Sequence, residues 1–400
     1  MTSLSVDKGP IAGGNTLTIM GTNFTGAKSV TFGGVPATSF IVISSTQISA
    51  TVPAGNVEGP VDVSVTTPKG TATVINAYTY ITSTNSDFAS GDGTAGNPYM
   101  IANAEQLDNV RDHLDSHFVL NGDVDLDVAP YNTGNGWVPI GTPSKPFTGT
   151  FDGNGKEING LFITAGTSVG LFGSTAGSAE IMNLELLGAN ISADGSNVGI
   201  LIGYMQEGTI HNCYVEGTIT NTNNSFYTGG LVGRMDSQAE VGRSHSNVDI
   251  FGSRSVGGLV GVNSGMIKQS YSEGSVGGNF TQVGGLVGEN SGTVLRAYSL
   301  AKIVSGSTDT GGLIGSNTGD VTETYAAGEV MGSGANTGGL IGLNNGSITK
   351  SYYDKDTTQK NDTGKGIPLT TEDMKIQNSF VGWDFGSDWE MDTDQYPGLK

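Results

Sequence analysis

The sequence predicts an all-β protein in which an immunoglobulin-like β-sandwich is followed by a parallel β-helix (a β-solenoid) with short helical caps. Three observations favour this fold class. Glycine occupies 64 of 400 positions, and many of these glycines recur in short blocks at a regular spacing. Short strand-like runs rich in β-branched and aromatic residues separate the glycines. The repeat shows no apolar spacing of 3.6 residues over three turns, so a helical solenoid fits poorly.

Residues 1–82 are interpreted as the sandwich. Strand-like runs alternate with Gly-Pro and Gly-Gly turns, as in LTIMG (17–21), TQISATV (46–52) and VDVSVTT (61–67). Evenly spaced short strands of this kind are typical of an immunoglobulin-like sandwich. The basic and acidic side chains of this segment cancel, so the whole formal charge of −20 lies beyond residue 82. This shift in composition and the Ser/Thr/Asn/Gly-rich stretch at 81–98 predict a domain boundary.

Residues 83–165 are interpreted as an N-terminal capping and leader section of the solenoid. The segment 101–114 places Leu107, Val110 and Leu114 on one stripe, which predicts an amphipathic helix. A helix before the first coil would cover strand edges that otherwise recruit other chains.

A Gly-Leu/Ile-x-Gly block recurs through the predicted solenoid at 166–356, and its leucines are spaced 30, 30, 28, 27, 27 and 27 residues apart. Three short strands and three bends would close one coil in 27 residues, and coils would stack about 4.8 Å apart. An asparagine column in the late copies predicts a hydrogen-bonded ladder along the stack. A second β-sandwich is the alternative, but it does not require this period. The columns are Leu171, Leu201, Leu231, Leu259, Leu286, Leu313 and Leu340; Asn263, Asn290, Asn317 and Asn344; and Tyr271, Tyr298, Tyr325 and Tyr352.

The tyrosine column continues into the longer early repeats as Tyr214 and His245. Simple alternation would put Val294, Arg296 and Tyr298 on one face. A charged side chain is not acceptable in the middle of an inward face, so we expect a bend or bulge there. The sequence therefore allows the tyrosines to lie either inside or outside the coil, and we expect them to lie inside.

Residues 357–400 are interpreted as a C-terminal cap. Thr370 or Thr371 is expected to cap a helical turn. Trp383, Phe385 and Trp389 are expected to plug the end of the stack.

Two parts of the chain resemble known families. The segments GGNTLTIMGTNF (13–24), VTFGGVPAT (30–38) and GPVDVSVTTPKG (59–70) resemble an IPT/TIG domain. Repeats such as GLVGVNSGMIKQSYSEGSV (258–276) resemble the GLUG motif. The resemblance implies a bacterial surface or secreted protein, because GLUG arrays occur in adhesins and in non-catalytic parts of IgA-specific metallopeptidases. Neither motif carries catalytic residues, and the HExxH signature of those peptidases is absent.

Two groups of residues have spacings found in metal sites. His113 and His117 could share a zinc ion, but no glutamate follows the first histidine and no third ligand is evident, so surface histidines are the preferred interpretation. Asp123, Asp125 and Asp127 share one face of a predicted strand and are the weak candidate for a calcium site. A solvated edge strand is the preferred interpretation of these aspartates.

Glu216 and Glu273 occupy one column two coils apart, with Asn247 between them. Their separation would be roughly 10 Å, near the spacing of an inverting glycosidase pair. Leu300 and Ala327 continue this column, however, and no neighbouring residue is evident that would raise one pKa. A structural role is therefore the preferred interpretation.

Cysteine occurs once, at Cys213, and is expected to be a buried small apolar side chain. One thiol can form neither an intrachain disulfide nor a structural zinc site. With 38 acidic against 18 basic side chains, the surface would repel nucleic acid and anionic lipid. No run of about 18 apolar residues predicts a membrane-spanning helix.

These observations predict an adhesion or ligand-binding protein without catalytic residues or an organic cofactor, located on the bacterial cell surface or secreted. Its expected partner is a host or environmental glycan or protein. The alternatives are a carbohydrate-active β-helix enzyme, such as a polysaccharide lyase or glycoside hydrolase, and a self-associating subunit of a filament, surface layer or virion fibre. The first twenty residues lack a basic start followed by an apolar core, so no signal peptide is visible, and either the chain is trimmed or export uses another route.

Overall fold

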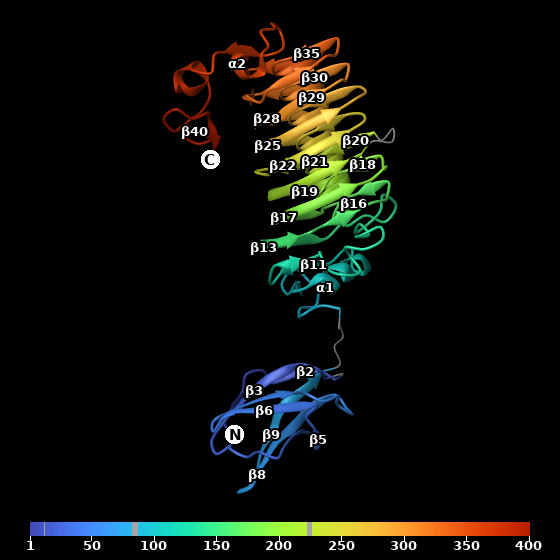
Figure 1. Cartoon of the computed structure of the whole chain (residues 1–400), viewed down its shortest axis with the longest axis vertical. Coiled ribbons are helices and arrows are strands. Elements are labelled where there is room, and N and C mark those ends of the chain that lie inside the picture. The colour runs from blue at the N-terminus through green and yellow to red at the C-terminus, as the bar shows by residue number, and fades with distance from the viewer. Residues whose placement is uncertain (12, 82–86, 222–225) are drawn as a thin grey trace. The chain divides into compact units, whose positions relative to one another are not determined.

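A computed structural model describes residues 1–11, 13–81, 87–221 and 226–400. The chain divides into two compact units, Met1–Asp87 and Phe88–Lys400, both built from strands (Figure 1). The predicted all-β fold class is confirmed. The boundary expected between residues 82 and 83 lies outside the described residues.

The first unit is a sandwich of a four-stranded and a five-stranded sheet. Strand alternation explains its core, because Leu17 and Ile19 of β3 are buried while their neighbours face outward. Tyr80 is also buried, and its hydroxyl donates to the carbonyl of Pro53 at 2.8 Å. The sheets run in the orders β1 (Ser3–Leu4), β3 (Thr16–Met20), β7 (Gln47–Thr51), β6 (Ser39–Ser44), and β2 (Lys8–Pro10), β9 (Gly70–Ile81), β8 (Gly59–Thr67), β4 (Ser29–Phe32), β5 (Val35–Pro36).

Near its start the second unit has a short helix at the end of the stack, next to β11 (Figure 1). The helix predicted at 101–114 is shorter than expected, consisting of α1 (Ala104–Asp108) and a 3₁₀ turn at Asn109–Asp112. Asn103 caps it by accepting a hydrogen bond from the Gln106 N–H at 3.0 Å. Leu107 and Val110 are fully buried in the solenoid core. The first parallel strands are β10 (Tyr99–Ile101), β11 (His117–Leu120), β12 (Val124–Asp125), β13 (Thr150–Asn159) and β14 (Phe162–Ile163).

Successive coils then stack as parallel strands in two sheets. The backbone N–H of Leu259 donates to the carbonyl of Leu286 at 2.9 Å, and Leu286 donates in the same way to Leu313 at 2.8 Å. All seven leucines of the repeat block are 0 % exposed. The smaller sheet contains β15 (Ser168–Val169), β18 (Asn197–Val198), β20 (Tyr227–Gly229), β23 (Val256–Gly257), β26 (Gln282–Gly284), β30 (Asp309–Gly311) and β35 (Asn336–Gly338).

The larger sheet continues from β14 through all remaining coils. Its strands are β16 (Phe172–Thr175), β17 (Glu180–Ser192), β19 (Ile202–Thr220), β21 (Val232–Gly242), β22 (His245–Gly252), β24 (Val260–Asn263), β25 (Met266–Gly278), β27 (Val287–Asn290), β28 (Thr293–Ser299), β29 (Lys302–Ser305), β31 (Ile314–Asn317), β32 (Asp320–Thr322), β33 (Tyr325–Ala326), β34 (Val330–Gly332), β36 (Ile341–Asn344), β37 (Ser347–Thr349), β38 (Tyr352–Asp354) and β39 (Ile367–Leu369).

Glycine is required in the repeat block by the close approach of neighbouring coils. A Cβ on Gly258 would lie 2.0 Å from the carbonyl oxygen of Gly285 in the next coil, and a Cβ on Gly285 would lie 2.1 Å from that of Gly312. Any larger residue would push the coils apart at this corner.

The asparagine column forms the predicted ladder. Each side-chain Nδ2 donates to the Oδ1 of the next asparagine, at 2.7 Å from Asn263 to Asn290, 2.7 Å from Asn290 to Asn317 and 2.8 Å from Asn317 to Asn344. An amide suits this column because it carries both a donor and an acceptor.

The end of the stack is covered by the segment that follows β38. The Asp354 side chain caps α2 (Lys355–Thr358) by accepting from the backbone N–H groups of Asp356 and Thr357. Further on, Asp362 accepts from the Gly339 N–H at 2.9 Å through its side chain and from the Tyr353 hydroxyl at 2.8 Å through its carbonyl. These contacts tie the segment to the last coil.

Residues 370–400, here called the C-terminal segment, run beside the stack (Figure 1). The segment contains 3₁₀ turns at Asp373–Lys375 and Gln377–Ser379, and a hairpin of β40 (Trp389–Glu390) and β41 (Gly398–Leu399). The Thr370 hydroxyl accepts from the Asp373 N–H at 3.0 Å, as a capping residue does. The expected aromatic plug does not form, because Trp383, Phe385 and Trp389 pack against tyrosines on the side of the coils.

Candidate functional site

The repeat tyrosines lie outside the coil, so the expectation of an inside position is wrong. Val294 and Ala297 are buried in the solenoid core, whereas Tyr298 belongs to a separate cluster on its outside. The expected bend is present at Arg296, whose φ of +51° is left-handed and reverses the alternation of the side chains. The same bend, with φ between 47° and 56°, recurs two residues before each member of the column, at Asn212, Arg243, Gln269, Arg296, Glu323 and Lys350.

The outward rings stack face to face along the solenoid. Their centroids are separated by 4.4 Å from Tyr214 to His245, 4.5 Å to Tyr271, 4.7 Å to Tyr298 and 4.8 Å to Tyr325. These distances match the spacing of neighbouring strands, because each ring is held by its own coil. The ring faces are occupied by one another, so only edges and polar atoms remain for solvent or a ligand.

The C-terminal segment covers the late part of this aromatic column. Tyr325 is 1 % exposed and its hydroxyl donates to the carbonyl of Pro397 at 2.9 Å. Arg296 ties the segment to the coils by pairing with Asp388 at 2.9 Å and with Glu323 at 3.1 Å. The early members Tyr214, His245 and Tyr271 are only partly buried.

The two glutamates singled out in the sequence lie beside the uncovered rings. Glu216, Asn247 and Glu273 are in register on successive strands. The Tyr214 hydroxyl donates to Glu216 at 3.0 Å, and burial together with this carboxylate raises the pKa of Tyr214 to about 12.

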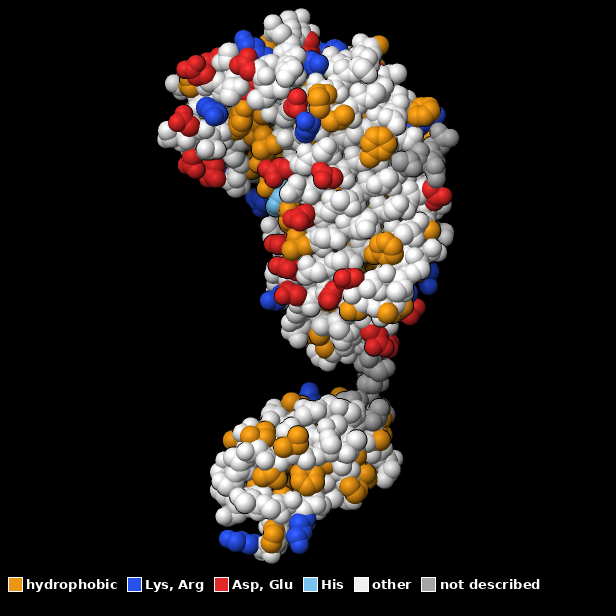
Figure 2. Space-filling view, viewed as in Figure 1, with side chains coloured by type: hydrophobic (Ala, Val, Ile, Leu, Met, Phe, Trp, Pro, Cys, Tyr) orange, Lys and Arg blue, Asp and Glu red, His pale blue; other side chains and the backbone are white. Residues whose placement is uncertain are grey.

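On the face shown in Figure 2, acidic side chains gather along one side of the stack, and exposed hydrophobic side chains are scattered among polar ones.

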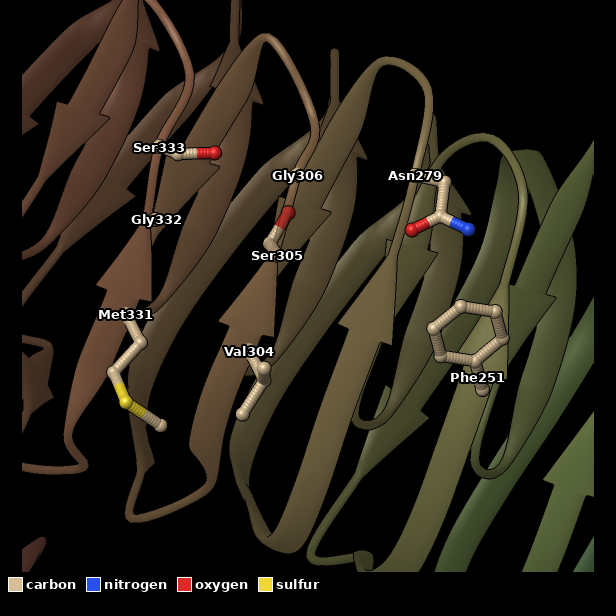
Figure 3. Close-up of a pocket in the computed structure, with 8 residues that line it drawn as sticks. All are labelled: Phe251, Asn279, Val304, Ser305, Gly306, Met331, Gly332 and Ser333. Atoms are coloured by element: carbon tan, nitrogen blue, oxygen red, sulfur yellow. The ribbon is translucent and has the colours of Figure 1, made fainter.

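A further outward column carries an open apolar hollow, here called the Phe251 hollow. Phe251, Gly277, Val304 and Met331 are in register, and the three side chains are 39 %, 48 % and 42 % exposed. Figure 3 shows Val304 and Met331 projecting from neighbouring strands, and Phe251 projecting on the far side of the strand that carries Gly277. Two adjoining cavities of about 530 Å³ and 340 Å³ share Phe251 and Val304 in their linings. These volumes lie within the usual range of small-ligand sites.

Sequence reasoning missed this hollow because its column does not repeat one residue type. A usable signal exists, since the column lies six residues after the aromatic column in each coil from Tyr214 to Tyr325. Once the aromatic column is known to face outward, alternation places Phe251, Val304 and Met331 outward as well.

The predicted metal candidates are placed separately. His113 packs edge-on against Phe88 and Tyr99, and His117 begins β11. Asp123, Asp125 and Asp127 are exposed; they accept hydrogen bonds from the Glu157 N–H at 3.1 Å, the Asp127 N–H at 2.8 Å and the Asn132 amide at 3.1 Å, respectively. Within the ranges that the structure describes, no three His, Cys, Asp or Glu side chains are arranged to hold a metal ion.

Cys213 is buried, with 1 % of its surface exposed. Burial raises the pKa of its thiol to about 12, so the thiolate needed for nucleophilic attack is disfavoured.

Comparison with known proteins identifies the first unit. Residues 1–83 match the model of the IPT/TIG domain family. The N-terminal unit is an IPT/TIG domain. The resemblance predicted for it is therefore confirmed.

Two relatives match a smaller part of the chain. A protein named as a Gly-rich membrane protein of Evansella cellulosilytica is 38 % identical over 185 residues, which is 45 % of this chain and 21 % of that protein. Halomucin of Haloquadratum walsbyi is 36 % identical over 167 residues, 40 % of this chain and 2 % of that protein. The chain thus corresponds to a small fraction of both relatives. Among its own described residues, no helix has the length and apolar character to cross a bilayer.

The solenoid has a counterpart among solved structures. A crystal structure described as that of a candidate immunoglobulin A1 protease of Bacteroides ovatus aligns with a TM-score of 0.56 and 20 % identity. The alignment covers 78 % of this chain and 95 % of that chain. At this identity the likeness extends to the fold.

Proposed function

We propose that this chain is the extracellular ligand-binding part of a bacterial cell-surface or secreted protein. We propose that it attaches to its ligand without catalysing a reaction on it. We also assign residues 166–356 to GLUG-type repeats, on the motif that they carry. The observation that carries the proposal is the outer face of β19, β22, β25, β28 and β29. This face carries the aromatic column, the column of Glu216, Asn247 and Glu273, and the Phe251 hollow side by side.

The rigidity of this face supports a binding role. Its strands are held by backbone bonds to neighbouring coils, and the buried asparagine ladder locks a corner of each late coil. A surface whose side chains are already ordered loses less conformational entropy when a ligand binds. The acidic surface and the names of the two relatives support a location outside the cell.

The test is binding with product analysis. The full chain is immobilised, exposed to separate panels of bacterial and host glycans and of surface proteins, and the eluted ligands are examined by mass spectrometry. We expect saturable binding with the ligand recovered intact. Release of cleavage products would refute a purely attaching role.

A matched pair of variants locates the face. Thr218→Arg places a large charged side chain on the outer face, whereas Ser237→Arg places the same side chain at an exposed position of β21, where the register with β19 shifts. We expect the first variant to weaken binding about tenfold, because its guanidinium obstructs the face, and the second to bind like the parent chain. Equal effects of the two variants would contradict the assignment of this face.

A further inference from the structure

We infer that the Phe251 hollow is a binding subsite for a neutral glycan made of uncharged hexopyranose units. The inference rests on the proposed function and names the site and the ligand class within it. The inference is based on the geometry of the Phe251 ring and on the polar groups around this ring. It is also based on the charge of the surface and on the backbone pairing of the strands beneath the ring.

The Phe251 ring is presented as a platform. Its register partner in the next coil is Gly277, and a Cβ at that position would lie 3.0 Å from the ring Cδ2 atom. The ring therefore lies against the glycine backbone, and Figure 3 shows it face-on. The electron-rich face of an aromatic ring attracts the polarised C–H groups that line one side of a pyranose.

The apolar surface continues along the stack. Val304 lies two coils from Phe251 and Met331 lies one coil further, in the same column. Two coils correspond to about 10 Å, so the column can contact more than one sugar unit of an extended chain. Because Gly277 has no side chain, the surface between Phe251 and Val304 is recessed.

Polar side chains surround this strip without partners of their own. Asp249 and Ser275 lie on one side of it, and Asn279 and Ser333 line the other. Among the described residues, none of these four side chains makes a hydrogen bond or ion pair. They offer acceptors, hydroxyls and one amide, which match the mixed donors and acceptors of sugar hydroxyl groups. A lipid or other apolar ligand would leave these groups unused.

Charge favours a neutral glycan. Asp249 is the one charged side chain among the lining residues of the two cavities, and the whole chain carries −20. Uronic acids and sialic acids would be repelled by this field.

The backbone beneath the hollow favours a glycan over an extended peptide. Peptides that add to a sheet use free backbone groups at a strand edge. Here the strands β25, β29 and β34 already pair with one another. Recognition on this face therefore depends on side chains.

The experiment uses the full chain and three matched oligosaccharide sets: neutral gluco-, manno- and galacto-oligosaccharides, with galacturonides as the charged counterpart of the galactosides. Affinities are measured by calorimetry for the parent chain, for Phe251→Ala, and for Phe226→Ala as the control. Phe226 is 42 % exposed, close to the 39 % of Phe251, but does not line the hollow. Unchanged tryptophan fluorescence in urea titrations verifies that both variants remain folded.

We expect at least one neutral set to bind, Phe251→Ala to weaken it about tenfold or more, and Phe226→Ala to leave it unchanged. We expect galacturonides to bind more weakly than galactosides. Equal losses in both variants, no loss in Phe251→Ala, tighter binding of galacturonides, or no binding of any neutral set would each overturn the inference. If a protein ligand binds intact while every glycan fails, the inference falls and the proposed function stands; cleavage of a bound glycan would overturn the proposed function instead.

Discussion

The asparagine ladder should make a measurable contribution to stability that depends on position in the stack. Asn290 is fully buried, donates to Asn317 at 2.7 Å and to the Gly292 carbonyl at 3.2 Å, and accepts from Asn263 at 2.7 Å. Asn290→Ala removes three hydrogen bonds at about 1 kcal/mol each, and it leaves buried partner groups unsatisfied at a further cost of about 1–3 kcal/mol. We therefore expect a loss of about 4–6 kcal/mol in the free energy of unfolding.

The last rung provides the matched comparison. Asn344 is only partly buried and has an asparagine partner on one side alone, so water can replace the lost amide. Asn344→Ala should cost about 1 kcal/mol. Urea unfolding followed by tryptophan fluorescence separates the solenoid from the IPT/TIG domain, because Trp137, Trp383 and Trp389 all lie in the second unit. Equal destabilisation by the two substitutions would refute the reasoning.

Three further predictions concern the outer face and the core. Burial lowers the pKa of His245 below its ordinary value of 6.5, so the imidazole binds a proton more readily in the unfolded chain than in the folded chain. The free energy of unfolding should therefore fall as the pH drops below 6.5. His245→Phe should make the urea midpoint less dependent on pH in this range. Trp389→Ala should cost about 3–5 kcal/mol and expose the C-terminal segment to limited proteolysis, while Trp389→Phe should cost less, because the indole N–H has no hydrogen-bond partner among the described residues. Cys213 should react with a maleimide only after unfolding, and labelling of the folded chain would contradict its burial.

The features that depend on the period of the sequence could be predicted from it. A leucine every 27 residues requires equivalent inward positions in stacked coils, and the asparagine column predicts a ladder because an amide both donates and accepts. The immunoglobulin-like sandwich could be predicted because its strands follow simple alternation, and the IPT/TIG family could be named because the motifs of residues 1–82 resemble it. These inferences use local rules that each coil obeys in the same way.

The direction of the tyrosines could not be predicted by the same rules. Arg296 adopts a left-handed conformation that favours glycine or asparagine, and nothing in its residue type signals this bend. One such residue turns the following side chains to the opposite side of the strand. The misplaced aromatic plug follows from the same error, because the tryptophans of the C-terminal segment pack where the tyrosines are, on the outside of the coils.

The Phe251 hollow required the fold before it could be found. Its members share a register position and no common residue type, so a search for repeated residues passes over them. Their ability to form a hollow depends on neighbouring residues in adjacent coils. Gly277, for example, lies under the Phe251 ring.

Because the late coils contact their neighbours in the same way, the length of the solenoid can change in steps of one repeat. From Leu259 to Leu340 each coil meets its neighbours through the same backbone bonds, so gain or loss of one 27-residue copy would change the length by about 4.8 Å and preserve the joints on either side. Val304 of the Phe251 hollow belongs to the same coil as Arg296 of the tethering pair Arg296–Asp388, because both lie between Leu286 and Leu313. Gain or loss of copies on the N-terminal side of Phe251 can therefore change the length of the solenoid and leave both the hollow and the tether unchanged.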